Sequence, residues 1–308
     1  MRKTSLDCVY ALAKKDKRVL FIGSDLGPGV LENFKKDLPN QFFMEGVAEQ
    51  FIIGMSAGLA KEGFIPYVNT IATFLTRRCY EQVAIDLCLH DLPVRLIGNG
   101  GGLVYAPLGP THLALEDFSL MKSLPNMTII SPCDAHEMKS LMHQTLNYMH
   151  PIYIRLGRGG EKIITKSNEK IEIGRGVLFK KPKDVLIIST GTMTQKALEV
   201  SKNTASENIN CGVLHLHTVK PIDVESIIKY SKEVKLILTI EEHFRSGGLG
   251  SSVLEVINDH FGKNSPSVIR VGVENQFPNE YGNQETLQDS CGLNVEEIRK
   301  KIFNFFNK

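Results

Sequence analysis

Glu49 stands where a carboxylate could do acid–base chemistry, because it follows an apolar run and opens a helical pattern. The run Phe-Phe-Met at residues 42–44 is typical of a strand. Residues 50–62 predict a helix of unusually small side chains, which indicates that something approaches its backbone closely. A carboxylate in a dry crevice there could hold a proton. The alternative is a structural role, since acidic residues in a first helical turn complement the helix dipole.

His112 is a second candidate, at the end of the motif Gly-Pro-Thr-His at residues 109–112. The motif predicts a sharp turn that presents an imidazole just before a helix over residues 113–122. A single histidine at a helix start is also a common cap or surface residue. Glu49 and His112 both lie beyond expected strands, however, and ligands of open α/β sheets bind outside the carboxyl ends of the strands. This arrangement favours one shared site.

A glycine-rich turn, Gly-Asn-Gly-Gly-Gly at residues 98–102, also follows an expected strand. Such turns commonly let backbone amides approach a ligand. The dinucleotide fingerprint needs glycine at its sixth position, where this chain has Leu103. A nicotinamide enzyme is therefore disfavoured.

Aromatic and glycine residues mark two further places. Phe74, Arg77 and Tyr80 have the spacing of one helical face, so that an aromatic ring could stack on a flat heterocycle or simply fill the core. Gly-Gly-Leu-Gly-Ser at residues 247–251 opens a helix and could hold an anion at its N-terminus. Close packing of helix against sheet, or across a subunit boundary, would explain the same glycines.

Composition places the chain among globular proteins that have no reason to seek nucleic acid or membranes. Its 308 residues carry a net charge of +2, with 42% hydrophobic and 23% charged residues. No apolar run is long enough for a membrane span, and the start lacks the apolar stretch of a signal peptide, so a cytoplasmic protein is expected. The six cysteines have neither metal-ligand nor Cys-x-x-Cys spacing, which indicates free buried thiols without a metal site.

The order of apolar and helical segments predicts an α/β protein of two consecutive, doubly wound domains with mostly parallel sheets. Expected helices alternate with the strands, for example over residues 74–89 and 135–148. We assign residues 1–157 to the first domain, 158–182 to a linker that could contain a small hairpin, and 183–308 to the second domain. The expected strands cover residues 18–23, 64–68, 94–97, 127–130 and 152–156, then 184–189, 212–215, 234–240 and 267–271.

Taken together, the motifs resemble the C-terminal half of the transketolase family of thiamine diphosphate enzymes. Gly-Val-Ala-Glu-Gln around Glu49 is followed by Thr-Phe-Leu at 73–75, Gly-Pro-Thr-His, and Ser-Leu-Pro-Asn-Met at 123–127. Ile-Glu-Glu-His at 240–243 and the glycine motif at 247–251 complete the series. Each motif is weak alone, but their order over most of the chain is specific. The resemblance implies a pyrimidine-binding domain followed by a transketolase C-terminal domain.

The resemblance also implies roles for individual residues. Glu49 matches the glutamate that hydrogen-bonds the cofactor's aminopyrimidine and promotes its imino form. Phe74 matches the aromatic that packs on this ring, with Tyr80 as support. His112 matches the histidine that faces the reacting carbons, and Arg158 falls where family members bind the donor's phosphate. A surface arginine in a linker is the alternative for Arg158.

The chain departs from the family pattern at two positions. Transketolases usually carry Asp immediately before Gly-Pro-Thr-His and a histidine in the donor site, where this chain has Leu108 and Gly100. Polar groups that recognise hydroxyls discriminate between sugars. The departures therefore indicate a donor other than the ordinary pentose phosphates, such as a modified, deoxy or nucleotide-linked sugar.

The sequence also lacks the Gly-Asp-Gly motif whose Asp, with a later Asn, holds Mg²⁺ in the family. The nearest approach, Gly-Ser-Asp-Leu-Gly at residues 23–27, falls at an expected strand end. We therefore expect a separate N-terminal subunit that carries Gly-Asp-Gly, binds Mg²⁺ and the diphosphate, and forms an α₂β₂ heterotetramer with this chain.

The expected activity is transfer of a two-carbon ketol unit from a ketose, expected to be phosphorylated, to an aldose. One alternative is a decarboxylating condensation on pyruvate or another 2-oxo acid, as in deoxyxylulose-phosphate synthases and 2-oxo-acid dehydrogenases. Another is a noncatalytic scaffolding subunit that kept the fold. Gly-Pro-Thr-His favours ketol transfer, and the presence of both Glu49 and His112 favours catalysis over scaffolding.

Overall fold

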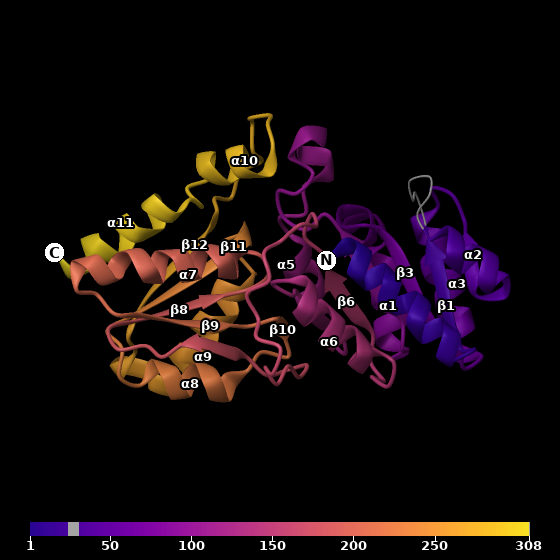
Figure 1. Ribbon diagram of the computed structural model, residues 1–308, viewed down its shortest axis with the longest axis horizontal. Coiled ribbons are helices and arrows are strands. Elements are labelled where there is room, and N and C mark those ends of the chain that lie inside the picture. Colours follow the sequence, from indigo (N-terminus) through magenta and orange to yellow (C-terminus); the bar gives the residue numbers. More distant parts are fainter. Residues whose placement is uncertain (24–30, 308) are drawn as a thin grey trace.

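The computed structural model describes residues 1–23 and 31–307, which form two α/β halves side by side (Figure 1). Each half is built on one mostly parallel sheet with helices on both faces. Strands such as Val19–Gly23 and Val185–Ser189 are buried at every residue, which is why their sequences are almost continuously apolar. The predicted fold class, two consecutive doubly wound α/β units with mostly parallel sheets, is confirmed.

The first sheet has seven strands within the described residues, in the spatial order β10-β5-β6-β4-β3-β1-β2. All neighbours run parallel except β10, which comes from the second half of the chain and pairs antiparallel with β5. The two halves therefore share a sheet at this edge. The bounds are β1 (Val19–Gly23), β2 (Phe42–Met44), β3 (Ile65–Ile71), β4 (Arg95–Asn99), β5 (Thr128–Ile130), β6 (Ile152–Arg155) and β10 (Thr218–Lys220).

Two layers of helices cover this sheet. Phe21 faces one layer and Ile22 the other, as alternating side chains of a strand must. The first layer consists of α1 (Arg2–Lys15), α2 (Glu32–Asp37) and α6 (Ala135–Thr145). The second consists of α3 (Glu49–Lys61), the π-helical segments Phe74–Arg78 and Val83–Leu89 with α4 (Tyr80–Gln82) between them, and α5 (Asp117–Lys122).

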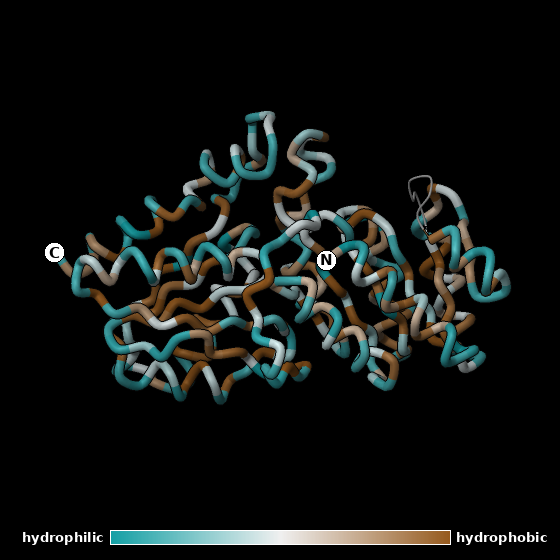
Figure 2. The backbone as a smooth tube through the Cα atoms, viewed as in Figure 1, coloured by the Kyte–Doolittle hydropathy of each residue, from teal (hydrophilic) through white to brown (hydrophobic). Residues whose placement is uncertain are grey.

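The second sheet has the order β12-β11-β8-β9-β7, and only its edge strand β7 is antiparallel among the described strands. Its strands are β7 (Val177–Lys180), β8 (Val185–Ser189), β9 (Cys211–His215), β11 (Leu236–Phe244) and β12 (Ser267–Val273). One face packs against α7 (Met193–Asn203), α10 (Gln284–Ser290) and α11 (Val295–Phe306), and the other against α8 (Val224–Ser231) and α9 (Leu249–Phe261). Figure 2 shows apolar strands enclosed by helices with hydrophilic outer faces.

The connection over residues 158–182 ends in β7, which pairs with β9 in the second sheet and not in a local hairpin. The division of the chain at residues 157 and 183 stays a prediction. No helix within residues 1–23 and 31–307 is both long and apolar enough to cross a membrane.

The helix expected over residues 113–122 is wrong in its first four residues, since α5 begins at Asp117. Leu113 is extended, and Ala114 exchanges two backbone hydrogen bonds of 3.0 Å with Gly102. Leu113 and Leu115 are instead buried in the core of the second half. This burial favours an extended backbone over another helical turn, and it ties the His112 turn to the second half.

A buried ion pair lies where the halves meet. Asp117 accepts hydrogen bonds of 2.8 Å from the Tyr153 hydroxyl and from Nε of Arg155, and both partners of the ion pair are buried. The Arg155 guanidinium also donates to the carbonyl oxygens of Ala114 and Glu242, at 2.8 Å each. Because Glu242 belongs to β11, this arginine connects the two halves.

Candidate cofactor and substrate site

Glu49 begins α3, and its side chain is buried as the sequence predicts for a candidate acid–base group. Gly46 has φ of +63°, a conformation that glycine adopts without strain, and it lets the chain turn from β2 into α3. Nη1 of Arg78 donates a hydrogen bond of 2.5 Å to Oε2 of Glu49. The Glu49 side chain is 1% exposed, whereas the Arg78 side chain is 44% exposed. The buried carboxylate of Glu49 is therefore paired with a guanidinium, that of Arg78, which lies on the solvent-exposed side of the site.

Phe74 contacts the arginine of this ion pair, and His112 contacts Phe74. The Arg78 guanidinium lies 4.4 Å from the centre of the Phe74 ring, and the His112 ring meets Phe74 edge to face at 5.3 Å between centroids. A guanidinium at this distance is attracted to the ring face. Glu49, Arg78, Phe74 and His112 thus form one continuous row, which we call the Glu49 row. It joins three of the site residues predicted from the sequence.

The turn that carries His112 is held from two directions. Gly109 has φ of +75°, and residues Pro110–His112 form one 3₁₀ turn. Arg77 donates to the carbonyl oxygen of Thr111 at 2.7 Å and pairs with Glu116 at 3.1 Å. The Thr111 hydroxyl lies 2.9 Å from Nδ1 of His112. The ring of His112 is thereby oriented by the turn as well as by Phe74.

Tyr80 makes a separate contact, a hydrogen bond of 2.8 Å with the Ser123 hydroxyl. The helical spacing of Phe74, Arg77 and Tyr80 is altered, because Phe74–Arg78 is π-helical and Cys79 leaves helical geometry before α4 begins at Tyr80. Phe74 and Arg77 both reach the His112 turn, whereas the hydroxyl of Tyr80 points to the start of the Ser-Leu-Pro-Asn-Met motif.

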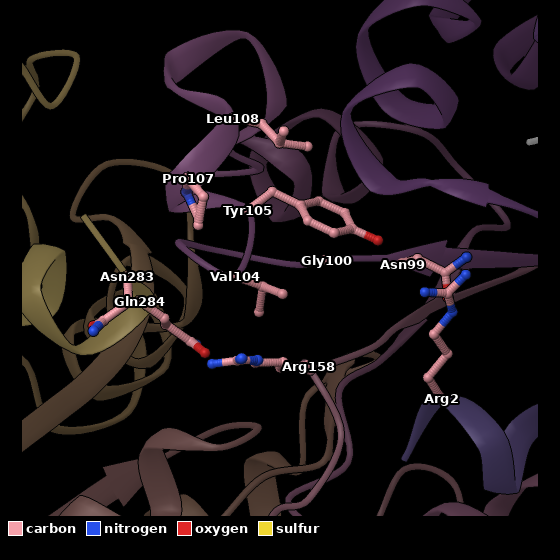
Figure 3. A pocket seen from close by; sticks show the side chains of 11 residues that line it. Arg2, Asn99, Gly100, Val104, Tyr105, Pro107, Leu108, Arg158, Asn283 and Gln284 are labelled. Atoms are coloured by element: carbon pink, nitrogen blue, oxygen red, sulfur yellow. The ribbon is translucent and has the colours of Figure 1, made fainter. Parts of the chain in front are cut away.

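Arg158 lines a cavity of about 300 Å³ together with Gly100 and Leu108, the two positions where the chain departs from its expected pattern (Figure 3). Arg2, at the start of α1, contributes a second guanidinium to the same cavity. From the second half come Asn283 and Gln284, beside Arg158. The cavity thus joins both halves and offers positive charge to a ligand.

The glycine turn at residues 98–102 packs closely against side chains of the chain itself, and its Gly100 also lines the cavity that contains Arg158. All four of its glycines make room for protein side chains, because an added Cβ would meet a side chain closer than 3.0 Å: Tyr153 at Gly98, Tyr105 at Gly100, Arg155 at Gly101 and Glu242 at Gly102. The next backbone amide, that of Leu103, donates a hydrogen bond of 2.6 Å to Oε1 of Glu242. This end of the turn therefore binds a carboxylate of the chain itself.

The glycine motif at residues 247–251 does place an anion-binding group at a helix start. Oε2 and Oε1 of Glu241 accept hydrogen bonds from the amides of Leu249 and Gly250, at 2.7 and 2.8 Å. Burial raises the pKa of Glu241 to about 7. The predicted close packing is present as well, since an added Cβ on Gly250 would lie 2.6 Å from the Thr239 hydroxyl.

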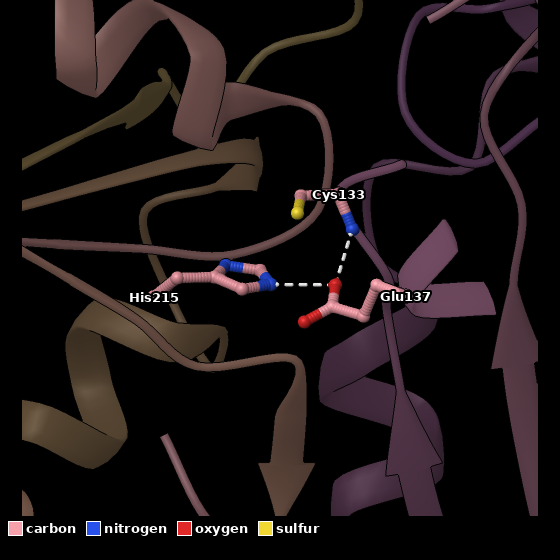
Figure 4. Close-up of side chains that lie close together, drawn as sticks. All are labelled: Cys133, Glu137 and His215. Atoms are coloured by element: carbon pink, nitrogen blue, oxygen red, sulfur yellow. Dashed lines mark hydrogen bonds and ion pairs between the residues drawn. The ribbon is translucent and has the colours of Figure 1, made fainter. Parts of the chain in front are cut away.

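A buried cluster of Cys133, Glu137 and His215 lies at the boundary between the halves (Figure 4). One donor atom from each lies within 4.8 Å of the others, a spacing that a metal ion could use. Oε2 of Glu137 is already bonded, however, to Nε2 of His215 at 2.9 Å and to the amide of Cys133 at 2.7 Å. Burial opposes ionisation of Glu137, but the neighbouring His215 outweighs it and lowers the carboxyl pKa to about 2. We interpret the cluster as a contact that fastens α6 to β9.

Several residues of these sites, among them Arg78, Arg2 and Gln284, escaped prediction from the sequence. Arg78 lies four positions after Phe74, so the helical spacing that selected Phe74 and Arg77 could also have selected it. Arg2 and Gln284 come from opposite ends of the chain, and no local pattern connects them with Arg158. The motif Gly-Ser-Asp-Leu-Gly continues over residues 24–27, which lie outside the described residues.

Comparison with known proteins identifies the family. Residues 1–160 match the family described as transketolase, pyrimidine binding domain, and residues 174–298 match transketolase, C-terminal domain. The chain belongs to the transketolase family. Among transketolase relatives, it is 33% identical to the 6-deoxy-6-sulfo-D-fructose transketolase subunit SqwH of Clostridium sp. (strain MSTE9), over 97% of this chain and 92% of that protein. It is also 33% identical to an apulose-4-phosphate transketolase subunit of Phocaeicola vulgatus, over 100% of this chain and 97% of that protein.

A solved transketolase structure has nearly the same fold over nearly the same length. It is described as a split-gene transketolase in an inactive β4 tetramer, and it superimposes with a TM-score of 0.90 at 32% identity, covering 98% of this chain and 97% of that one. The family membership expected from the sequence is therefore confirmed. Transketolases of this family use thiamine diphosphate, so membership supports a role in a thiamine diphosphate-dependent transferase.

Proposed function

We propose that this chain is the C-terminal subunit of a two-chain transketolase that moves a two-carbon ketol unit from a ketose, expected to be phosphorylated, to an aldose. The proposal is carried by the Glu49 row, in which a buried carboxylate, an aromatic face and an imidazole follow one another in space. His112 contacts Phe74 and is held by Arg77 through the turn. Such a row can hold a flat cofactor at one end and the reacting carbons at the other.

The row fits the aminopyrimidine of thiamine diphosphate. A guanidinium is flat and donates N–H groups, and the guanidinium of Arg78 already contacts both the Phe74 ring and the Glu49 carboxylate. A flat nitrogen heterocycle could make the same two contacts, with Tyr80 as support through Ser123. When bound, thiamine diphosphate supplies an electron sink for breaking and forming carbon–carbon bonds beside a carbonyl.

The residues of the chain have separate tasks in this mechanism. Glu49 holds a proton against the ring nitrogen of the pyrimidine, in a buried position where water does not compete. Phe74 orients the ring. His112 hydrogen-bonds the substrate oxygen on which negative charge develops. Arg158, with Arg2 in the same cavity, binds the anionic end of the sugar.

A partner subunit is part of the proposal. Two adjacent segments, α3 and Val83–Leu89, expose large apolar side chains: Phe51 is 60% exposed, Ile85 45% and Leu89 69%. Val47, just before α3, is 71% exposed. Apolar residues gathered in this way mark protein interfaces. We infer that they meet an N-terminal subunit that carries Gly-Asp-Gly and the Mg²⁺ ligands, in an α₂β₂ heterotetramer.

The test is to purify this chain with the product of a neighbouring reading frame that carries Gly-Asp-Gly and a later Asn, and to assay ketol transfer. Glu49→Gln should lower turnover by at least about 100-fold while leaving the assembly and its melting temperature nearly unchanged. Glu62→Gln, at the exposed far end of α3, is the matched control and should behave as wild type. Near-normal turnover of Glu49→Gln would support a scaffolding subunit instead.

Pyruvate, offered in place of the ketose, separates the decarboxylating alternative. Release of carbon dioxide with condensation onto an aldehyde, without transfer from any ketose phosphate, would contradict the proposed function. Turnover by the purified chain alone would contradict the need for a second subunit.

A further inference from the structure

The ring of Tyr105 lies directly on Gly100, in the wall of the cavity that contains Arg158. A Cβ atom added to Gly100 would lie 2.1 Å from Cε2 of Tyr105 and 2.2 Å from Cδ2, so no side chain can occupy position 100 while this ring keeps its place. Gly100 has φ of +77°, which also favours glycine. The Tyr105 ring and a side chain at position 100 therefore exclude each other, because the ring occupies the space into which that side chain would project.

The segment that carries Tyr105 is anchored on both sides. Leu103 and Ala106 are fully buried in the core of the second half, and the amide of Ala106 bonds the carbonyl oxygen of Leu103 at 3.0 Å. The Tyr105 carbonyl accepts the amide of Leu108 at 2.8 Å and closes the next turn. A tyrosine held between two buried residues has a defined direction, and its ring is half-buried.

The cavity around Tyr105 has two chemically different sides. Figure 3 shows the Tyr105 hydroxyl reaching toward Asn99 and Arg2, while Leu108, Pro107 and Val104 lie toward the other end of the ring. Among the described residues that line the cavity, two are arginines and none is a carboxylate. A ligand here would meet the guanidinium groups of Arg2 and Arg158, which lie apart in the cavity, the phenol hydroxyl of Tyr105 and an apolar wall at Leu108.

We propose that Tyr105 is a specificity-determining residue for the ketose donor, a role that rests on the proposed function. The phenol contacts a hydroxyl of an anionic ketose through one hydrogen bond, and the apolar side chain of Leu108 accepts a carbon of that ketose that carries no hydroxyl. The favoured donor is thus a ketose with an anionic terminal group and fewer hydroxyls than an ordinary sugar phosphate. Removing the phenol hydroxyl should bring together the kcat/KM values of two donors that differ only at the hydroxyl that the phenol contacts.

The experiment compares Tyr105→Phe with wild type in the assembled enzyme, with D-fructose 6-phosphate and its 4-deoxy analogue as donors. Tyr105→Phe should change the ratio of the two kcat/KM values by about tenfold, the effect of one hydrogen bond, with the thiamine diphosphate Kd unchanged. Tyr281→Phe is the matched control, because Tyr281 packs on Gly109 of the next turn but does not line the cavity. An unchanged ratio in a wild-type enzyme that does transfer ketol units would overturn this inference alone, whereas no transfer from any ketose would overturn the proposed function as well.

A second measurement tests the packing without any substrate. Gly100→Ala should lower the melting temperature of wild type, and by about 3 °C or more beyond its effect in a Tyr105→Ser background, where the ring no longer stands in the way. The strain of alanine at positive φ is common to both backgrounds and cancels. Equal effects in the two backgrounds would show that the ring does not fill the space at position 100.

Discussion

Glu49 with Arg78 and Asp117 with Arg155 are both pairs of a buried carboxylate with an arginine, and they differ in what covers the arginine. The Arg155 side chain is 7% exposed, and its Nη2 also donates to the carbonyl oxygens of Ala114 and Glu242. The Arg78 side chain is 44% exposed and rests on the ring of Phe74. One pair is closed on all sides by the two halves, and the other is open on the arginine side.

We interpret the closed pair as a structural contact and the open pair as part of the proposed cofactor site. Breaking a closed pair leaves an uncompensated charge in the interior, so a closed pair holds the halves together. In an open pair the cation can move into water at little cost, and the carboxylate can then accept another N–H donor. The open pair is the one that lies in the Glu49 row, next to exposed apolar residues.

Asp117→Asn should have the largest effect on stability, and it tests the closed pair. It removes the carboxylate that is bonded to Nε of the buried Arg155, and we expect a loss of about 3–5 kcal/mol in the free energy of unfolding, measured by urea denaturation. Asp91→Asn is the matched control, because Asp91 pairs with His150 at the surface and should cost less than about 1 kcal/mol. Similar losses for both variants would show that the closed pair is worth no more than a surface pair.

His112→Asn should have the opposite profile, a large loss of activity with little loss of stability. Removing a group that stabilises charge in the transition state lowers turnover by about 100- to 1000-fold, measured in the assembled enzyme. The free energy of unfolding should change by less than about 0.5 kcal/mol, since His112 is not among the buried residues of the core. His260→Asn, on the exposed end of α9, serves as the control. A stability loss matching that of Asp117→Asn would place His112 among the structural contacts.

His217 gives the boundary between the halves a pH dependence. Burial lowers the pKa of His217 to about 4, so the folded chain keeps the ring neutral while the unfolded chain binds a proton below about pH 6.5. Stability from this group is present above pH 6.5 and is lost as pH falls toward 4, by up to about 3 kcal/mol. His217→Gln should remove that part of the pH dependence, measured as the free energy of unfolding between pH 7 and pH 4. The exposed His90→Gln should not, and parallel curves for all three proteins would contradict the prediction.

Phe51→Ser should have the smallest effect of the four variants, and it tests whether the exposed apolar residues next to the Glu49 row bind the partner subunit. Because Phe51 is 60% exposed, the isolated chain should lose little stability, but its Kd for the N-terminal subunit should rise by about tenfold or more. Phe277→Ser is matched in exposure, at 63%, and lies in the second half. An equal effect of the two variants on assembly would mean that α3 does not face the partner.

Local patterns in the sequence were sufficient for most strands, though not for β7 or β10, and for placing Glu49 at the start of a helix. Val185–Ser189 is apolar at each buried position except Ser189, and the small residues of α3 mark where Glu49 begins a helix. Patterns of this kind depend on neighbours in the chain, so they can be recognised without knowing the fold.

Contacts between distant residues set the limit of such prediction. The amide of Leu103, just after the glycine turn at 98–102, donates a hydrogen bond to Glu242, about 140 positions away. The helix expected at residue 113 begins four residues later because the second half buries Leu113 and Leu115. In each case the deciding partner comes from the other half, and no spacing within the motif could reveal it.

The edge strand β10 has a consequence for where this polypeptide can be divided. Its residues, Thr218–Lys220, come from the second half but complete the first sheet at β5, and Nζ of Lys220 donates to the carbonyl oxygen of Lys122 at 3.0 Å. A fragment that stopped near residue 173 would leave β5 with an unpaired row of backbone groups, ready to pair with another molecule. Expression of the first half by itself should therefore yield aggregates. A gene that is divided in two, naturally or by engineering, has to keep β10 in the same polypeptide as β5.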